Sequence, residues 1–422
     1  MFMLLLMALV SCSSSEEAVK ELENETGSET EFVDDPGPAL TAAQEETFNE
    51  NVNVFTFNMF RALANRNAGQ SLVSSPLSAA TVLAMLNDGA MGKTREELLR
   101  VLGFGEAKTR AMNEYFQKLM QAEGKYYGTK LQISDGVFVR QGYDFKPSFV
   151  NDMRLYYDAP AEVLDFSQPA SVDHINNWCA EHTNGVIPRI VETLQPDAIS
   201  VFLNAIFFKG KWLNQFNEKK TKQQKFTLED NTQKNVPMMQ IRKAMYYYED
   251  NLCQAVCLNY MDVDYAMTVL LPKPGRKVID IIGSLTEEWW KSLNANITYS
   301  SEEGNEVMLS LPRFSVETKG EAMEDLSGVL SDMGVHSMFN PATAQFPNIL
   351  TTAGLYVSQI VQKATIDVNE EGTVAAAVTS GFLYGSPGPQ PGVVTFTADH
   401  PFVYVISNQR TGIVFFIGTY QG

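Results

Sequence analysis

Residues 372–398 read GTVAAAVTSGFLYGSPGPQPGVVTFTA and hold no charged side chain, although the 422-residue chain carries 50 Asp and Glu. Pro387, Pro389 and Pro391 disfavour a helix or a sheet interior, so the middle of this stretch is predicted to be an exposed loop. The first half consists of small, uncharged residues that a β-sheet can bury without a desolvation cost. A loop this long in a compact domain is usually functional. Because its first half could also form a buried strand, the stretch indicates a segment with two stable positions, one exposed and one within a sheet.

The alternation of side chains along the first half is compatible with a strand. Neighbouring residues of a strand face opposite sides of the sheet. One face of this segment suits burial between existing strands, and it holds Thr373, Ala375, Ala377, Thr379, Gly381 and Leu383. An Ala-rich helix from Thr373 to Thr379 is the competing interpretation, and the segment alone does not decide between the two.

The rest of the chain carries an ordered set of motifs that decides between the strand and the helix interpretation. Glu370-Glu371-Gly372-Thr373, followed by alanines, resembles the hinge of the serpin reactive-centre loop. Further stretches resemble serpin signatures, namely residues 75–78, 89–94, 98–104, 175–178, 183–185, 204–212, 311–314, 398–402 and 411–418. The match runs in order and without a gap from about residue 45 to residue 422. The sequence therefore resembles the serpin family closely.

This resemblance implies an α+β fold, with three β-sheets, a surrounding set of helices and an exposed reactive-centre loop at about residues 370–396. It also implies a single large domain over residues 45–422, although length alone would suggest two or three domains. The residue patterns predict a helix over residues 48–63 and strands over 201–208, 263–271 and 307–311. Ser75 before Pro76 is a predicted helix start, and Thr94 with Glu97 fits a capping box.

The resemblance implies a protease inhibitor that acts as a suicide substrate, and hence a protein that is not an enzyme. A serine-type endopeptidase cleaves the loop and forms an acyl-enzyme, and the severed loop inserts into the main sheet before hydrolysis completes. The hinge and insertion residues would be Glu370, Glu371, Gly372, Thr373, Ala375, Ala376 and Ala377. The alternative is a non-inhibitory serpin, which acts as a carrier, a chaperone or a protease substrate. Such members generally lose the small hinge residues that this chain retains.

The resemblance leaves the scissile bond open. Counting from Gly372 by the usual family distance reaches Ser386, but Pro387 would then follow the cut, which suits few serine proteases. Cleavage after Leu383 or Tyr384 suits chymotrypsin- or subtilisin-like proteases, and cleavage after Gly385 or Ser386 suits elastase-like ones. The loop contains no Lys or Arg, so trypsin-like targets are not expected, while cysteine proteases are a further class of partner.

Five residues are predicted to lie where the main sheet opens. Asn204 interrupts an apolar run, and a buried amide must find hydrogen-bond partners, as an ordinary core Asn also would. The resemblance groups Asn204 with Ser75 and Ser78 and places Trp212 under the top of the opening. Gln362 is a departure, because serpins usually have His at this position. Gln forms hydrogen bonds but does not titrate near neutral pH.

The N-terminal residues predict export. Residues 1–11 are apolar, too short to span a bilayer, and resemble a signal peptide. The sequence from Leu9 to Cys12 resembles a bacterial lipobox, in which Cys12 would be lipidated; a plain signal peptide is the alternative. Residues 12–44 would then form the lipidated N-terminus and an acidic, disordered tether. We expect a lipid-anchored protein of the bacterial cell envelope, and the sequence leaves surface exposure open.

Composition restricts the other partners. A net charge of −18 argues against nucleic acid, which binds through Lys and Arg. The four His and the Cys residues show no metal-ligand spacing, and we expect no metal and no cofactor. In a strand Cys253 and Cys257 would lie about 13 Å apart, too far for a disulfide, so these and Cys179 are predicted to be free thiols. The resemblance implies a monomer.

Overall fold

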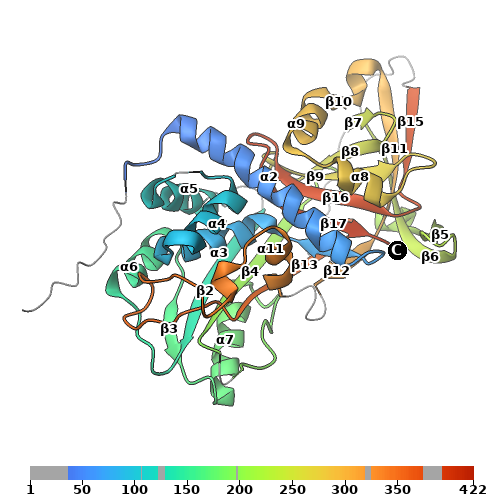
Figure 1. Ribbon diagram of the computed structural model, residues 1–422. Coiled ribbons are helices and arrows are strands. Elements are labelled where there is room, and N and C mark those ends of the chain that lie inside the picture. Colours follow the sequence, from blue (N-terminus) through green and yellow to red (C-terminus); the bar gives the residue numbers. More distant parts are fainter. Residues whose placement is uncertain (1–36, 106, 122–128, 196–197, 319–324, 374–391) are drawn as a thin grey trace, which may run out of the picture. The chain divides into compact units, whose positions relative to one another are not determined.

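A six-stranded sheet contains both the hinge and the residues predicted to lie where the sheet opens. Its middle strand, Ser200–Lys211 (β4), carries an apolar run broken only by Asn204, and that pattern predicts burial on both faces. In the computed structural model the strand order is β12-β13-β14-β4-β2-β3, with β12 at Phe314–Glu317, β13 at Gln359–Val368, β14 at Gly372–Thr373, β2 at Lys130–Arg140 and β3 at Ala161–Leu164. The structure describes residues 37–105, 107–121, 129–195, 198–318, 325–373 and 392–422 (Figure 1).

Two further sheets complete the three that were expected. The seven-stranded sheet has the order β1-β17-β16-β9-β8-β7-β10, formed by Leu72–Ser74, Val414–Tyr420, Phe402–Asn408, Tyr265–Pro272, Cys253–Asn259, Tyr246–Glu249 and Thr298–Tyr299. The four-stranded sheet has the order β15-β11-β6-β5, formed by Gly392–Thr397, Asn305–Pro312, Gln233–Lys243 and Lys222–Thr227. The predicted strands at 263–271 and 307–311 correspond to β9 and β11, with ends shifted by about two residues.

Helices surround these sheets. The predicted helix over residues 48–63 lies within α2 (Ala42–Arg66), and Ser75 caps α3 (Pro76–Gly89) as predicted, with its Oγ accepting a hydrogen bond from Ser78 N at 3.4 Å. The other helices within the described residues are α4 (Gly92–Leu102), α5 (Thr109–Gln121), α6 (Pro147–Tyr156), α7 (Pro169–His182), α8 (Val278–Ser284), α9 (Glu287–Asn296), α11 (Ser327–Asp332) and the 3₁₀ turns η1 (Glu218–Lys220), η2 (Ser300–Glu303) and η3 (Ser337–Phe339).

The two faces of β4 pack against different helices. Phe202 and Ile206 point into the main core, which α2, α3 and α5 also line. Val201 and Leu203 alternate with them and pack on the other face against α7, where Trp178 is a central residue (Figure 1). The helices α8 and α9 cover the seven-stranded sheet. The described residues from 37 onward form one compact unit, so the predicted α+β fold in a single large domain is confirmed.

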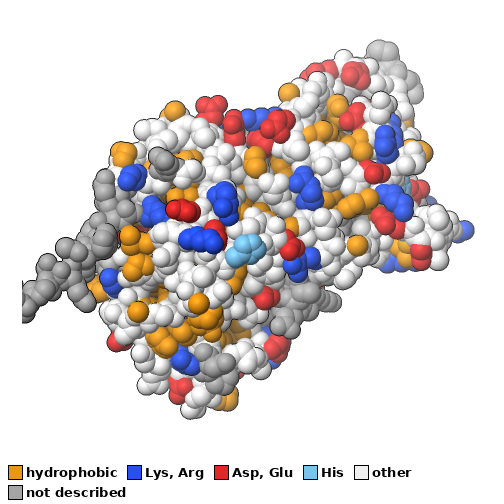
Figure 2. Space-filling model, viewed as in Figure 1, with side chains coloured by type: hydrophobic (Ala, Val, Ile, Leu, Met, Phe, Trp, Pro, Cys, Tyr) orange, Lys and Arg blue, Asp and Glu red, His pale blue; other side chains and the backbone are white. Residues whose placement is uncertain are grey.

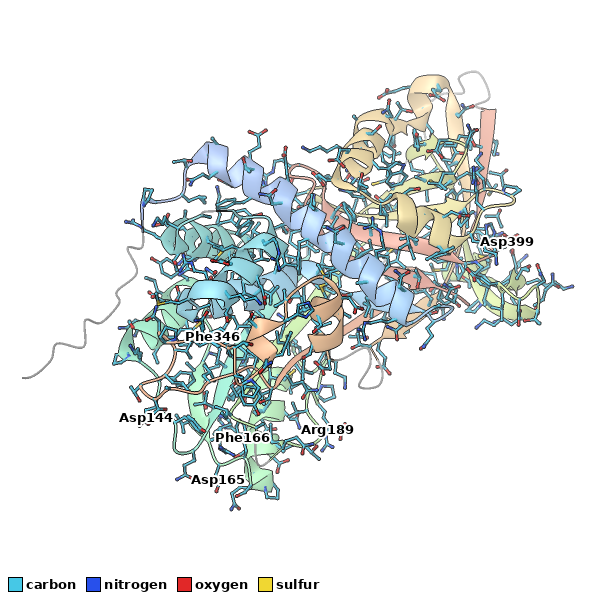
Figure 3. All side chains as sticks on the ribbon, in the orientation of Figure 1. Asp144, Asp165, Phe166, Arg189, Phe346 and Asp399 are labelled. Carbon is cyan, nitrogen blue, oxygen red and sulfur yellow. The ribbon has the colours of Figure 1, made fainter. Side chains whose placement is uncertain are left out.

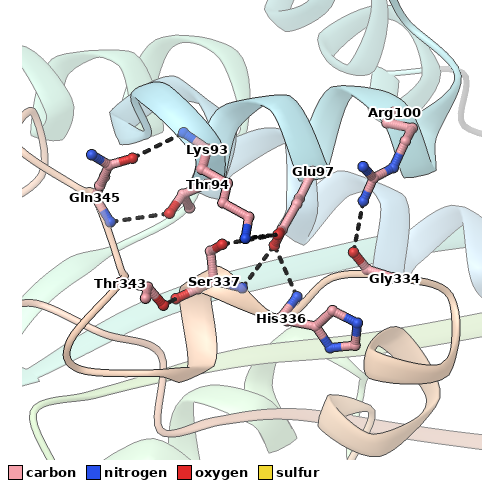
Figure 4. Close-up of polar contacts among 9 residues, drawn as sticks. All are labelled: Lys93, Thr94, Glu97, Arg100, Gly334, His336, Ser337, Thr343 and Gln345. Carbon is pink, nitrogen blue, oxygen red and sulfur yellow. Dashed lines mark hydrogen bonds and ion pairs between the residues drawn. The ribbon is translucent and has the colours of Figure 1, made fainter.

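The predicted capping box of Thr94 and Glu97 is wrong. The helix α4 begins after Met91, and both side chains instead bind a segment far away in the sequence (Figure 4). Thr94 Oγ1 accepts a hydrogen bond from Gln345 N at 3.0 Å, while the Glu97 carboxylate accepts hydrogen bonds from the backbone N of His336 and Ser337 and from the Ser337 hydroxyl. Burial opposes ionisation of Glu97, but these hydrogen bonds hold its pKa below the usual value. The two residues that match a local capping motif therefore make hydrogen bonds to a segment distant in the sequence instead.

The three cysteines of the domain are free thiols, as predicted. Cys179, Cys253 and Cys257 are all buried, and burial raises the pKa of each thiol to about 12. They are therefore protonated and unreactive at neutral pH. None of the helices that the structure describes has both the length and the apolar character needed to cross a membrane.

Candidate functional site

The hinge residues Gly372 and Thr373 form the short strand β14 at one end of the six-stranded sheet. The strand lies antiparallel between β4 and β13: Gly372 pairs with Lys211, and Thr373 pairs with Gly210 on one side and Val368 on the other. Further along, β4 and β13 pair directly with each other in parallel. The first two residues of the predicted insertion segment are thus already in the sheet, and the gap beyond them is closed.

The backbone of β4 lies so close to residue 372 that only glycine fits. A Cβ atom at this position would lie 2.0 Å from the carbonyl oxygen of Gly210, far inside the contact distance. Thr373 is 1% exposed, and its hydroxyl lies 2.8 Å from the hydroxyl of Tyr260. The space between the two strands therefore requires glycine at residue 372 and accepts a small side chain with a hydroxyl at residue 373.

Trp212 fixes the turn that joins β13 to β14. Its indole stacks on the Tyr260 ring with centroids 4.5 Å apart, and its Nε1 donates a hydrogen bond to Asn369 O at 2.9 Å. Its backbone N donates to Glu371 O at 2.8 Å. The Glu371 carboxylate has one buried oxygen, Oε2, without a hydrogen-bond partner among the described residues. Trp212 thus lies directly beneath the hinge.

Glu370 anchors the same turn through its side chain. Its carboxylate is nearly buried and accepts hydrogen bonds from Arg313 Nη2 at 2.6 Å and from Thr221 Oγ1 at 2.5 Å. Burial opposes ionisation, but the hydrogen bonds from Arg313 and Thr221 outweigh it and hold the pKa of Glu370 below its usual value. The charge pair therefore holds the turn against the segment that joins β11 to β12.

A polar cluster in the middle of the sheet brings together the other predicted residues. Asn204 Oδ1 accepts hydrogen bonds from Ser78 Oγ at 2.5 Å and from Gln362 Nε2 at 3.3 Å. Gln362 Nε2 also donates to Ser75 O at 2.8 Å, and its Oε1 accepts from Ser74 Oγ at 3.0 Å. All of these residues are buried. The cluster connects β13 to β4 and to the start of α3 where the two strands meet.

Asp135 is a member of this cluster that the sequence reasoning missed. Its Oδ1 accepts a hydrogen bond from Asn204 Nδ2 at 2.6 Å, whereas its Oδ2 is buried and has no hydrogen-bond partner in the part of the chain that the structure describes. The side chain is fully buried, and burial raises the pKa of Asp135 to about 7. The signal in the sequence was a single acidic residue within the otherwise uncharged run at 131–139.

Several predicted residues lie outside the described residues, namely Cys12, Ala375, Ala376, Ala377, Leu383, Tyr384, Gly385, Ser386 and Pro387. Both ends of the range predicted as the loop, 370–396, lie in or beside strands. At the near end, residues 370–373 lead into and form β14. At the far end, β15 pairs in parallel with β11, with Val394 opposite Val307. The stretch that joins two different sheets is thus residues 374–391.

Within the described ranges, no three His, Cys, Asp or Glu side chains gather as they would around a metal ion. His400 lies 2.9 Å from Asp399 and 3.0 Å from Pro272 O, which holds the start of β16 against β9. On the face shown in Figure 2, Lys and Arg side chains are interspersed with Asp and Glu.

Comparison with known proteins agrees with this architecture. The family model described as "Serpin (serine protease inhibitor)" matches residues 50–421. The leukocyte elastase inhibitor of Xenopus laevis is 30% identical over 87% of this chain and 97% of its own. The native structure of the thermophilic serpin tengpin superposes with a TM-score of 0.80 at 25% identity, over 89% of this chain and 94% of its own. Human thyroxine-binding globulin, in complex with thyroxine, gives a TM-score of 0.79 at 25% identity, over 90% and 99% of the two chains.

The family model covers the hinge strand, the central polar cluster and all three sheets. These are the elements that the sequence motifs had pointed to in order along the chain. The chain belongs to the serpin family.

Proposed function

We propose that this protein inhibits serine-type endopeptidases by trapping them as acyl-enzymes. The observation that carries the proposal is the position of β14, which lies between β4 and β13 with the two strands closed beyond it. A loop cut by a protease is free at one end, and it can extend β14 by separating the two strands. Burial of its apolar and small residues then drives the insertion.

The register of β14 supports this extension. Each further residue of the loop would lie one residue further back along both β4 and β13. Thr379 would then lie between Asn204 and Gln362, which pair directly in the closed sheet. Ala375 and Ala377 would share the core-facing side with Thr373. Small side chains suit this side because it is already lined by large, buried residues of the main core.

The length of the inserted strand supports a trap. About fourteen residues of strand span roughly 46 Å, and a domain of this size has a radius of gyration of about 21 Å. A protease attached to the end of the cut loop would therefore be carried from one end of the domain to the other. Asp399, which follows the loop and β15, and Arg189, which follows α7, lie far apart in the described unit (Figure 3).

The test is incubation with elastase, chymotrypsin and subtilisin, followed by denaturing electrophoresis. We expect a band at the summed mass of inhibitor and protease that resists denaturation. Cleavage of the loop with full residual protease activity would instead favour the second candidate, a non-inhibitory serpin. The likeness to thyroxine-binding globulin, which was solved in complex with thyroxine, is the observation behind that candidate.

Cleavage is expected between Leu383 and Ser386. This range avoids a cut directly before Pro387 and contains an apolar, an aromatic and two small residues. Chymotrypsin- and subtilisin-like enzymes should cut after Leu383 or Tyr384, and elastase-like enzymes after Gly385 or Ser386. Mass spectrometry of the released C-terminal fragment identifies the bond, and a fragment that begins at Gln390 or later would contradict this assignment.

We also propose that the protein is exported and anchored to the bacterial envelope through a lipidated Cys12. Cells grown with labelled palmitate should label the protein, and Cys12→Ala should remove the label and release the protein from membranes. Ser11→Ala, which retains the thiol, is the control and should stay labelled. A label that persists in Cys12→Ala would contradict the lipid anchor.

A further inference from the structure

A pocket of about 690 Å³ lies beside the ends of β4 and β13 that are remote from β14. Ile190, Val191 and Leu194 line it from the segment that follows α7, and Val201 and Val361 line it from β4 and β13. Each of these five residues is at most 8% exposed, so one wall of the pocket is apolar and already formed, while Glu192, Gln195 and Asp325 are among its polar lining residues. Ser358 Oγ at its edge is buried and lacks a hydrogen-bond partner among the described residues.

The pocket lies on one defined face of the sheet. Val201 and Val361 both pack in the cluster beneath α7, together with Ile190, Val191 and Leu194. The alternate residues of the same strands, Phe202 and Ile360, face the main core. A side chain that enters the pocket from a strand between β4 and β13 must therefore point toward the α7 face.

The register of β14 determines which side chain that is. The same number of residues separates Thr373 from Phe382 as separates Gly210 from Val201, so residue 382 of an extended β14 would lie opposite Val201. The pairing with β13 gives the same result independently, because it places residue 382 opposite Gln359, and Val201 and Gln359 are direct partners in the closed sheet. Residues directly opposite each other in neighbouring strands share a face. Residue 382 would therefore point to the α7 face.

We propose that this pocket receives the Phe382 side chain when the cut loop inserts. The inference rests on the loop insertion of the proposed function and adds a residue-specific site to it. An aromatic ring can pack against the apolar wall of this pocket, which is already formed, so its burial requires little rearrangement of the segment at 190–195. Phe382 is thereby a positioning residue that fixes the far end of the inserted strand.

The test compares the cut and uncut forms of three proteins: wild type, Phe382→Ala and Val374→Ala. Val374 shares the face of Phe382 but would lie beside the other end of β4, away from the pocket. Each protein is cut once in the loop with subtilisin. Mass spectrometry then verifies that the cut lies on the C-terminal side of residue 382, so that this residue remains on the strand that inserts. Guanidinium unfolding, followed by circular dichroism, then gives the midpoint of each form.

Phe382→Ala should lower the midpoint of the cut form by about 0.5 M, as expected for a large apolar side chain removed from a buried site. The uncut form should keep its midpoint, and Val374→Ala should shift the cut form much less. Leu194→Trp, which fills the pocket, should lower the midpoint of the cut form as well, and adding Phe382→Ala to it should restore part of the loss. If Leu194 and Phe382 did not share the pocket, the effects of the two substitutions on the midpoint would add, and the double variant would be less stable than either single variant.

Three outcomes would overturn the inference. If cutting stabilises wild type but Phe382→Ala has no effect on the cut form, insertion occurs and the pocket is not the site of Phe382. If cutting does not stabilise wild type at all, insertion itself is absent. If the uncut protein forms a dimer that Leu194→Trp abolishes, the occupant is a second copy. Failure to form a protease complex in the electrophoresis test would refute the proposed inhibition and leave this measurement valid.

Discussion

Thr373→Arg should turn the protein from an inhibitor into a substrate. The Thr373 side chain is 1% exposed between β4 and β13, and its partner there is the neutral hydroxyl of Tyr260. A guanidinium buried beside this neutral hydroxyl would destabilise both β14 and its extension. An unpaired buried charge costs several kcal/mol, so the number of inhibitor molecules consumed per trapped protease should rise by about 100-fold or more.

Titration of a protease with the variant, together with electrophoresis, measures this ratio. Thr373→Ser is the matched control, because it keeps the hydroxyl beside Tyr260 and fits the same space. It should inhibit nearly as well as wild type. An unchanged stoichiometry for Thr373→Arg would contradict the assignment of the core-facing side of the inserted strand.

Asp135→Asn should stabilise the folded protein above about pH 7 and have little effect below about pH 4. The pKa of Asp135 is raised by burial from 3.8 to about 7, so the folded state holds the proton more tightly than the unfolded state. The contribution of Asp135 to the free energy of unfolding is fully present below its pKa in the unfolded state. This contribution is lost as the pH rises through its pKa in the folded state. A shift of this size corresponds to about 2–4 kcal/mol once an uncharged amide replaces the carboxylate.

Urea unfolding between pH 4 and pH 9, followed by tryptophan fluorescence, measures the difference between the two proteins. Asp88 and Glu287 also have pKa values raised to about 7 by burial, but they are present in both proteins and cancel in that difference. Tyr157, which directly follows α6, interacts with Asp88, Asp135 and Asp152, and burial raises its pKa well above the usual value, so it stays neutral throughout. A difference that is the same at every pH would contradict a buried, titrating Asp135.

Local residue types were sufficient to predict several helices and strands, whereas the fold and the hinge were inferred from the resemblance of the ordered motifs to the serpin family. An apolar run around Asn204 and a Ser-Pro helix start each specify one local structure, whereas the small residues after Gly372 left a strand and a helix open. The ordered motifs then allowed a single large domain to be predicted where length alone suggested more. The three sheets and the capped helix α3 confirm that reasoning.

The contacts that could not be predicted from the sequence join residues that are distant in the chain. Glu97 resembled a local cap but binds the segment at 336–337. Asp135 joined the central polar cluster because β2 pairs with β4, which brings Asp135 directly opposite Asn204. Nothing in the local pattern encodes such a pairing, since strand neighbours are chosen by the whole fold. For the same reason, the sequence alone could not predict the register that would align residue 382 with the pocket beneath α7.

The two-residue length of β14 has a kinetic consequence. Joining a long, free loop to a distant sheet normally requires a slow search, because the ends must first be brought together against the entropy of the chain. In this protein that search was completed when the domain folded, since Thr373 is already paired with Val368 of β13 and with Gly210 of β4. After cleavage only growth from an existing nucleus remains, one residue at a time. Under the proposed trapping of an acyl-enzyme, the outcome would be a race between strand growth and deacylation of the protease, and the nucleus would give strand growth an early start.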